Sequence, residues 1–119
     1  YDPECRNPSR EGTLKDCRTR STGRLGSSKK WPKQAPESLT GILSADPEQN
    51  PVFHNWTLVF VPYCDGASFS GNAVVDGLHF KGSAILNAII AELKASTGIR
   101  EAERVVVSGT SAGASAVFF

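Results

Sequence analysis

The sequence predicts an α/β fold built on a mostly parallel sheet with helices covering both faces, in three layers. Three observations lead to this prediction: a β-branched apolar run at 57–61, helical spacing of apolar residues over 80–97, and a second β-branched apolar run at 105–108. Strand, helix and strand in this order form a right-handed crossover, whose two strands are parallel. Because 119 residues are few for such a fold, we expect part of one, truncated at both ends.

Each element has its own signals. The strand at 57–61 ends at Pro62, and a small, polar, glycine-rich loop follows over 63–72. In open α/β sheets, ligands bind at the edge that such loops leave. The helix is expected to begin near Phe80 and to stop before Gly98. The second strand leads into a turn and a last helix, in which Phe118 and Phe119 are expected to lie in the core.

The chain is expected to be a single partial domain over 1–119. Residues 1–51 would form its loop-rich, basic head, and residues 52–119 would form a strand, a loop, a helix, a second strand and the nucleophile-elbow turn. The head holds most of the 13 Lys and Arg and little periodicity, apart from a short helix expected near Ser38. Its charge indicates a solvated loop in the first instance, with contact to an anionic substrate or polysaccharide as the alternative.

The composition excludes several classes of function. A net charge of +1 gives no electrostatic case for nucleic acid as a partner. No apolar run is long enough to predict a membrane span. The three cysteines, Cys5, Cys17 and Cys64, have no zinc-like spacing, so neither a metal nor a cofactor is expected.

The cysteines indicate the compartment instead. Cys5 and Cys17 could close a bridge, although sequence alone does not fix the pairing. Asn55-Trp56-Thr57 is an N-glycosylation sequon. Cysteines in a polar segment together with a sequon favour a secreted protein that contains disulfides.

The segment Gly109-Thr110-Ser111-Ala112-Gly113 is a G-x-S-x-G motif placed between a predicted strand and a predicted helix. That placement is typical of the nucleophile elbow of an α/β-hydrolase. Ser111 would then attack an ester carbonyl, and the backbone N–H of Ala112 would donate to the oxyanion. The alternative is a glycine-bearing turn with a solvated serine.

Other polar residues have open roles. Asp65, followed by Gly66, either lines the pocket at the end of the first strand or caps its own turn, and we weigh these alternatives equally. His54 precedes the strand, at the wrong edge of the sheet for a catalytic base. His79 opens the predicted helix and is expected to be structural or at the pocket rim rather than the base.

The chain also resembles the pectin acetylesterase / Notum family of carboxylester hydrolases. The resemblance extends over nearly the whole chain, in the family's order, and Tyr63-Cys64-Asp65-Gly66-Ala67-Ser68-Phe69 is its most specific segment. Further matching segments are Arg24–Lys29, Gly41–Ser44, Asn50-Pro51, Asn55-Trp56 and Leu78–Gly82. Ala114 stands where the family usually has a glycine.

The resemblance implies a secreted or cell-wall serine carboxylesterase. Its substrate would be an acylated polysaccharide such as pectin, with acetyl as the acyl group, or a lipid-modified protein. The family's catalytic Asp and His would lie beyond Phe119 and its glycine-rich oxyanion stretch before Tyr1, so the chain alone is expected to be inactive. Cys64 would pair with a cysteine before Tyr1, as would Cys5 or Cys17. The alternative function is a catalytically inactive, hydrolase-like module that binds a glycan.

Overall fold

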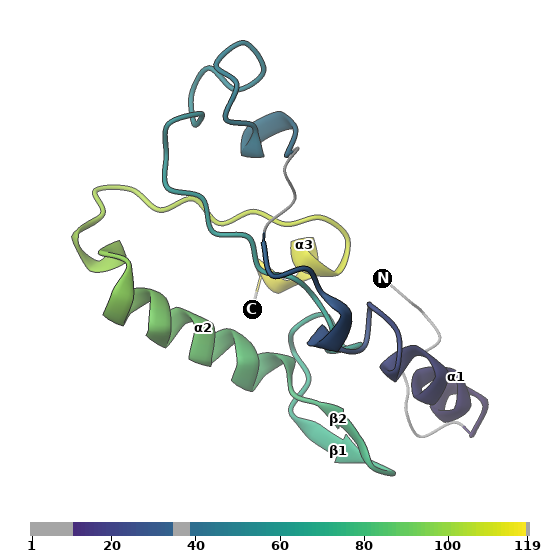
Figure 1. Cartoon of the computed structure of the whole chain (residues 1–119). Coiled ribbons are helices and arrows are strands. Elements are labelled where there is room, and N and C mark those ends of the chain that lie inside the picture. The colour runs from purple at the N-terminus through teal and green to yellow at the C-terminus, as the bar shows by residue number, and fades with distance from the viewer. Residues whose placement is uncertain (1–10, 35–38, 119) are drawn as a thin grey trace. The chain divides into compact units, whose positions relative to one another are not determined.

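The computed structural model describes residues 11–34 and 39–118 (Figure 1). The chain divides into two compact units, residues 1–30 with 63–119, and residues 31–62. The helices, 3₁₀ turns and strands in chain order are α1 (Glu11–Ser21), η2 (Ser28–Lys30), η3 (Gly41–Leu43), β1 (Ala73–Val75), β2 (Leu78–Phe80), α2 (Gly82–Ser96), η4 (Ile99–Glu101) and α3 (Ala112–Ala116).

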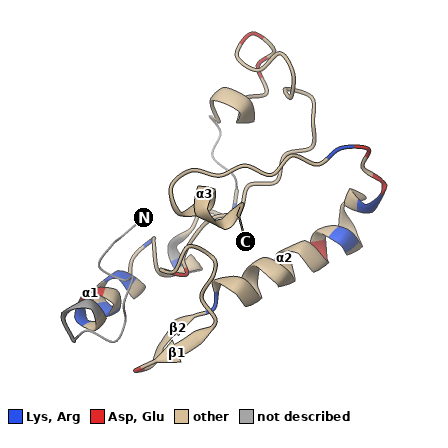
Figure 2. Ribbon diagram, turned by 180° about the vertical axis from the view of Figure 1, so that it is seen from behind, with Lys and Arg blue, Asp and Glu red and all other residues tan. Residues whose placement is uncertain are grey.

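Helix α1 lies in the basic head, at a place where no helix was predicted. Within it the Thr19 hydroxyl donates to the Lys15 carbonyl at 3.3 Å, and basic residues occupy the last turn, where they complement the helix dipole. Cys17 is a buried residue of α1, and it packs against Phe80 of β2 in a small hydrophobic core. Figure 2 shows the blue Lys and Arg segments along this helix. The short helix expected near Ser38 falls at 35–38, outside the described residues.

A two-stranded antiparallel hairpin follows the 63–72 loop. Ala73 pairs with Phe80, and Val75 with Leu78. Asp76 and Gly77 join the strands, both at positive φ (49° and 77°), as a two-residue type I′ turn requires. The exposed Arg18 guanidinium pairs with the Asp76 carboxylate and donates to the Asp76 carbonyl at 3.0 Å. This ion pair connects α1 to the hairpin, although exposed pairs contribute at most about 1 kcal/mol.

Helix α2 confirms the predicted helix with one adjustment at its start. The expected range was 80–97, and the observed range is Gly82–Ser96. Phe80 and His79 belong to β2 instead. At the other end, the Thr97 N–H donates to the Leu93 carbonyl at 3.2 Å, and Gly98 follows at a φ of 69°, which is the expected glycine stop.

The two predicted parallel strands are not formed within the described residues. The segments 57–61 and 105–108 have no ladder partner and are not strands, and the only sheet in the described part of the chain is the β1-β2 hairpin. Val105, Val106 and Val107 are 56%, 57% and 68% exposed. A buried parallel strand needs a hydrogen-bonded neighbour and cover on both faces, and neither is present among these residues. Phe118, expected in the core, is likewise exposed, while Phe119 lies outside the described residues.

The unit over 31–62 is organised by one buried asparagine. The Asn50 amide donates to the carbonyls of Ile42 and Ser44 at 3.0 and 2.9 Å. The side-chain oxygen of Asn50 accepts the Phe53 N–H at 3.0 Å. The backbone carbonyl oxygen of Asn50 lies 3.1 Å from Nδ1 of His54. Each buried polar atom of this side chain is therefore satisfied, as burial demands.

Candidate functional site: a strained serine turn and a capped loop

Ser111 occupies an unusual backbone conformation immediately before α3. Its φ is 57° and its ψ is −118°, outside the small left-handed region that L-residues tolerate. Such a conformation costs about 1–3 kcal/mol and tends to occur at functional sites. The residue is exposed. The turn is closed around it by hydrogen bonds from Gly113 N–H to the Thr110 carbonyl (3.0 Å) and from Ser115 N–H to the Ser111 carbonyl (3.2 Å).

The two glycines of the motif differ in what surrounds them. A Cβ on Gly109 would overlap the carbonyl group of Gly113 and lie 2.6 Å from the Ala114 nitrogen. A Cβ on Gly113 would meet no atom within 4 Å. Gly109 is therefore required by the close approach of the chain to the start of α3, whereas Gly113 is not required by space within the described chain.

Ala112 opens α3 and is buried. The first N–H groups of a helix have no acceptor inside it. Among the described residues, no hydrogen-bond acceptor is found for the Ala112 N–H. This N–H can therefore donate to an incoming group beside Ser111.

Asp65 is buried, and both of its carboxylate oxygens accept backbone hydrogen bonds. Oδ2 accepts the Ala67 N–H at 3.1 Å, and Oδ1 accepts the N–H of Gly82, the first residue of α2, at 2.7 Å. The next amide of the helix, Ser83 N–H, donates to the Gly71 carbonyl at 3.0 Å. Of the two roles considered for Asp65, turn capping describes these contacts, and the carboxylate also satisfies the start of α2.

Three residues of the same loop have positive φ: Gly66 (75°), Ser68 (53°) and Phe69 (63°). The Ser68 N–H donates to the Tyr63 hydroxyl at 2.8 Å, and the Tyr63 and Phe69 rings lie 5.1 Å apart. Burial raises the pKa of Tyr63, while the hydrogen bond from the Ser68 backbone opposes that rise. No sequence signal predicted positive φ at Ser68 and Phe69, because neither residue type favours it.

Glycine is required where α2 meets this loop. A Cβ on Gly82 would overlap the Asp65 carboxylate and lie 2.6 Å from the Phe69 Cα. A Cβ on Gly71 would lie 2.7 Å from Oδ1 of Asp65. The loop and the helix are therefore packed through backbone and carboxylate atoms rather than through large side chains.

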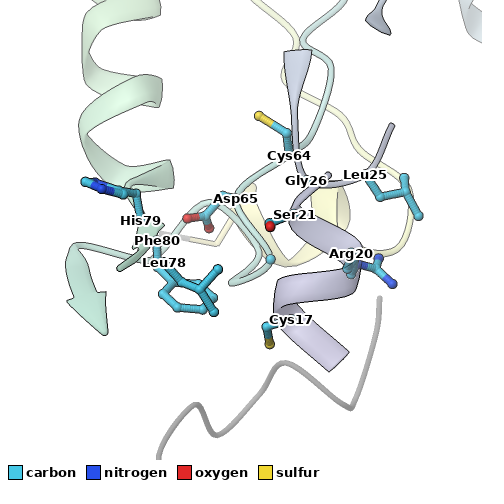
Figure 3. Close-up of a pocket in the computed structure, with 11 residues that line it drawn as sticks. Cys17, Arg20, Ser21, Leu25, Gly26, Cys64, Asp65, Leu78, His79 and Phe80 are labelled. Carbon is cyan, nitrogen blue, oxygen red and sulfur yellow. The ribbon is translucent and has the colours of Figure 1, made fainter. Parts of the chain in front are cut away.

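A small cavity lies beside the loop, with side chains from α1, the loop and β2 around it (Figure 3). Its volume is about 40 Å³, which holds a few waters and is far below the roughly 300–1,000 Å³ of pockets for drug-sized ligands. Asp65 and Gly66 line it, as does His79, and Ser111 is not among its described lining residues. That Asp65 and Gly66 belong to a substrate pocket stays a prediction.

The cysteines and the other histidine are assigned as follows. Cys17 is disulfide-bonded, Cys64 is a free thiol, and Cys5 lies outside the described residues. Burial, and then the charge of Asp65, raise the pKa of the Cys64 thiol. The expected pairing of Cys64 with a cysteine before Tyr1 stays a prediction. His54 is held by the Asn50 carbonyl, as described above.

Among the described residues, no group of three His, Cys, Asp or Glu side chains is arranged to hold a metal ion. None of the helices in the described ranges has the length and apolar character to cross a bilayer.

A serine at positive φ at the start of a helix, with a close-packed glycine two residues before it, is the local geometry of α/β-hydrolases. Comparison with protein families agrees with this class. The family model described as Pectinacetylesterase matches residues 5–119, and the chain belongs to this family of carboxylester hydrolases, whose fold is that of the α/β-hydrolases.

Relatives come from both branches of the family. The chain is 42% identical over 106 residues to pectin acetylesterase 4 of Arabidopsis thaliana, covering 85% of this chain and 25% of that protein. It is 41% identical over 96 residues to palmitoleoyl-protein carboxylesterase notum2 of Xenopus laevis, covering 79% and 19%. The chain thus spans about a fifth to a quarter of the length of the curated relatives it matches.

Proposed function

We propose that this chain carries the nucleophile of a secreted serine carboxylesterase, and that Ser111 is that nucleophile. The observation that carries the proposal is the backbone of Ser111, held at a φ of 57° directly before α3. A strained turn of this kind presents the serine Oγ at its apex, where it can reach a carbonyl carbon.

In the proposed reaction, Oγ of Ser111 forms a bond to the ester carbonyl carbon, and the serine proton passes to a histidine base. The carbonyl oxygen becomes an oxyanion that accepts a hydrogen bond from the Ala112 N–H. As this intermediate collapses, the C–O bond to the leaving group breaks, and the histidine returns its proton to that oxygen, which leaves as the alcohol. Water, deprotonated by the same histidine, then attacks the acyl-serine, and the acid is released as the serine oxygen regains its proton. A single oxyanion donor contributes on the order of 100- to 1,000-fold in rate.

The base is proposed to be neither of the histidines in this chain. His54 precedes the 57–61 segment and belongs to the 31–62 unit rather than to the unit that contains Ser111. His79 lies on β2 beside a cavity whose described lining excludes Ser111. The three-layer fold with its parallel sheet belongs to the same proposal, because the segments 57–61 and 105–108 have the composition of buried parallel strands.

The proposed substrate is an acyl ester on a polysaccharide such as pectin, with acetyl as the acyl group. The segment Asp65–Phe69 supports this choice, since it resembles the pectin acetylesterase branch. A lipid ester on a protein is the second candidate, because the identity to the notum2 relative is nearly as high. In both cases the site of action is extracellular or in a cell wall.

The test uses a longer chain that includes residues 1–119 together with the reading frame on both sides of them. A fluorophosphonate probe should label the wild-type protein and not Ser111→Ala, and acetate release from acetylated pectin should fall by at least about 1,000-fold in the variant. Ser115→Ala, in the helix that directly follows Ser111, is the matched control and should keep both signals. Labelling that persists in Ser111→Ala would remove Ser111 from the proposal.

Loss of both signals in the wild-type longer chain would favour the glycan-binding alternative. The 119-residue chain by itself is expected to show no Ser111-dependent hydrolysis of p-nitrophenyl acetate.

A further inference from the structure

We infer that Asn55 is an N-glycosylation site, and that the turn which carries it is shaped to present the amide and to support the first sugar. The inference rests on the secretory location within the proposed function, because the transfer of N-glycans takes place in that pathway. It does not depend on the identity of the ester substrate.

The sequence offers one acceptor pattern. Asn55-Trp56-Thr57 has the required threonine two residues after the asparagine, while Asn7-Pro8-Ser9 is excluded by the proline between its asparagine and serine. Asn50, Asn72 and Asn87 have no Ser or Thr at that spacing.

The structure places Asn55 at the third position of a β-turn. The Trp56 N–H donates to the Phe53 carbonyl at 3.0 Å and closes the turn. The first residue of the turn is also anchored, because the Phe53 N–H donates to the side-chain oxygen of the buried Asn50. Asn55 and Thr57 are exposed, and Thr57 begins a segment without helix or strand. A transferase can therefore reach the amide and the hydroxyl together.

The two nearby asparagines have opposite environments. Asn50 is 3% exposed, and its amide is used by two carbonyls of the chain. In the part of the chain that the structure describes, the Asn55 amide makes no hydrogen bond, so modification of its nitrogen breaks no internal contact.

Aromatic rings flank the acceptor. Phe53 and Trp56 lie edge to face, with ring centroids 4.9 Å apart and an interplanar angle of 88°. Trp56 is 37% exposed, so part of an aromatic surface next to Asn55 is open to solvent. The C–H face of an N-acetylhexosamine packs well on such a surface, because both are apolar.

The sugar donor for this modification is an oligosaccharide linked to a lipid diphosphate. A bond forms between Nδ2 of Asn55 and C1 of the first sugar, while the bond from C1 to the diphosphate oxygen breaks. The diphosphate leaves with the electron pair, and the amide nitrogen gives up one proton to a base of the transferase.

The experiment expresses the 119-residue chain behind a cleavable secretion signal in a eukaryotic host. Five forms are compared: wild type, Asn55→Gln, Thr57→Ala, Thr57→Ser and Asn87→Gln. The measurement is intact mass and gel mobility before and after peptide N-glycosidase, with peptide mapping for conversion of Asn55 to Asp. The glycan should be present in wild type, Thr57→Ser and Asn87→Gln and absent from the other two variants.

Cell-associated and secreted chains are both analysed. A mass that shows cleavage of the secretion signal establishes that the chain entered the secretory lumen, even where it is not exported. A wild-type chain that has lost its signal and carries no glycan overturns the inference, as does a glycan that survives Asn55→Gln. Ser111→Ala should be glycosylated like wild type. Failure of the proposed esterase with an intact glycan, or the reverse, therefore separates the two proposals.

Discussion

The loop over 65–71 and the turn at Ser111 both hold non-glycine residues at positive φ, but they are supported in different ways. The loop is stabilised by a buried carboxylate, a tyrosine hydroxyl and the first amides of α2. The serine turn follows three valines that are more than half exposed. The first conformation is determined by contacts inside the described chain. The second is closed by backbone hydrogen bonds and by the close approach of Gly109 to the start of α3.

The largest effect is expected at the carboxylate of the loop. Asp65→Ala leaves the buried N–H of Gly82 and the part-buried N–H of Ala67 without their acceptor and should lower the free energy of unfolding by about 2–4 kcal/mol. Asp46 is the matched control, because its exposed carboxylate also accepts an N–H from two residues on, that of Glu48 at 2.9 Å. Asp46→Ala should cost about 0.5–1 kcal/mol. Urea denaturation followed by circular dichroism measures both, and equal losses would contradict the assigned role of Asp65.

The next effect separates the two glycines of the serine motif. Gly109→Ala forces a Cβ into the backbone of α3 and should cost about 1–3 kcal/mol. Gly113→Ala has open space and a helical position, so it should stabilise by about 0.5–1 kcal/mol. The same denaturation experiment compares them. If both variants shift the midpoint in one direction, the close approach at Gly109 is not a real constraint.

A smaller effect is expected from relief of backbone strain. Ser111→Gly removes the Cβ at positive φ and should protect the Ser115 amide by about 1 kcal/mol in hydrogen exchange. Ser115→Gly, within α3, should lower protection of the same amide by about 0.5 kcal/mol. Faster exchange of the Ser115 amide in Ser111→Gly, together with slower exchange of that amide in Ser115→Gly, would argue against strain at Ser111.

The smallest effect is a change in thiol reactivity. Because the Cys64 pKa is raised above its ordinary value of 9.0, disulfide-reagent labelling at pH 8 should be slower in the folded chain than in urea, and should increase as the pH rises past 9. Cys64→Ser identifies the signal. A rate at pH 8 that is equal in the folded and unfolded chains would contradict the pKa shift.

The same shift fixes the sign of a pH effect on stability. A group whose pKa is raised on folding binds more protons in the folded state, so its stabilisation is complete below the unfolded pKa and is lost as the pH rises through the folded pKa. Deprotonation of Cys64 and Tyr63 should therefore reduce stability in alkali, starting near pH 9 for Cys64 and near pH 10 for Tyr63.

Sequence reasoning succeeded where the signal was local and repeated. The apolar spacing of Ala84, Ile85, Ala88 and Ile89 predicted α2 to within two residues at its start, and Gly98 predicted its end. Helix α1 was missed because its sequence is polar and its buried contact is a single cysteine. The hairpin had a signal that could have been used, the Asp76-Gly77 turn between apolar pairs.

The remaining differences depend on distant partners. The contact of Asp65 with Gly82 spans 17 residues, and no spacing rule specifies it. The valines at 105–107 were predicted as a buried strand from their composition, but pairing requires a neighbour that the described residues do not supply. The glycines around Ser111 did indicate a sharp turn. Where two backbone segments approach closely, only small residues fit, and this restriction can be recognised in the sequence.

Asp65 has one more consequence, for any movement of the loop. A single carboxylate accepts both the Ala67 and the Gly82 amides, and no carbonyl inside α2 can replace it for Gly82. A ligand that displaces the loop must therefore supply an acceptor, or admit water, at the first amide of the helix.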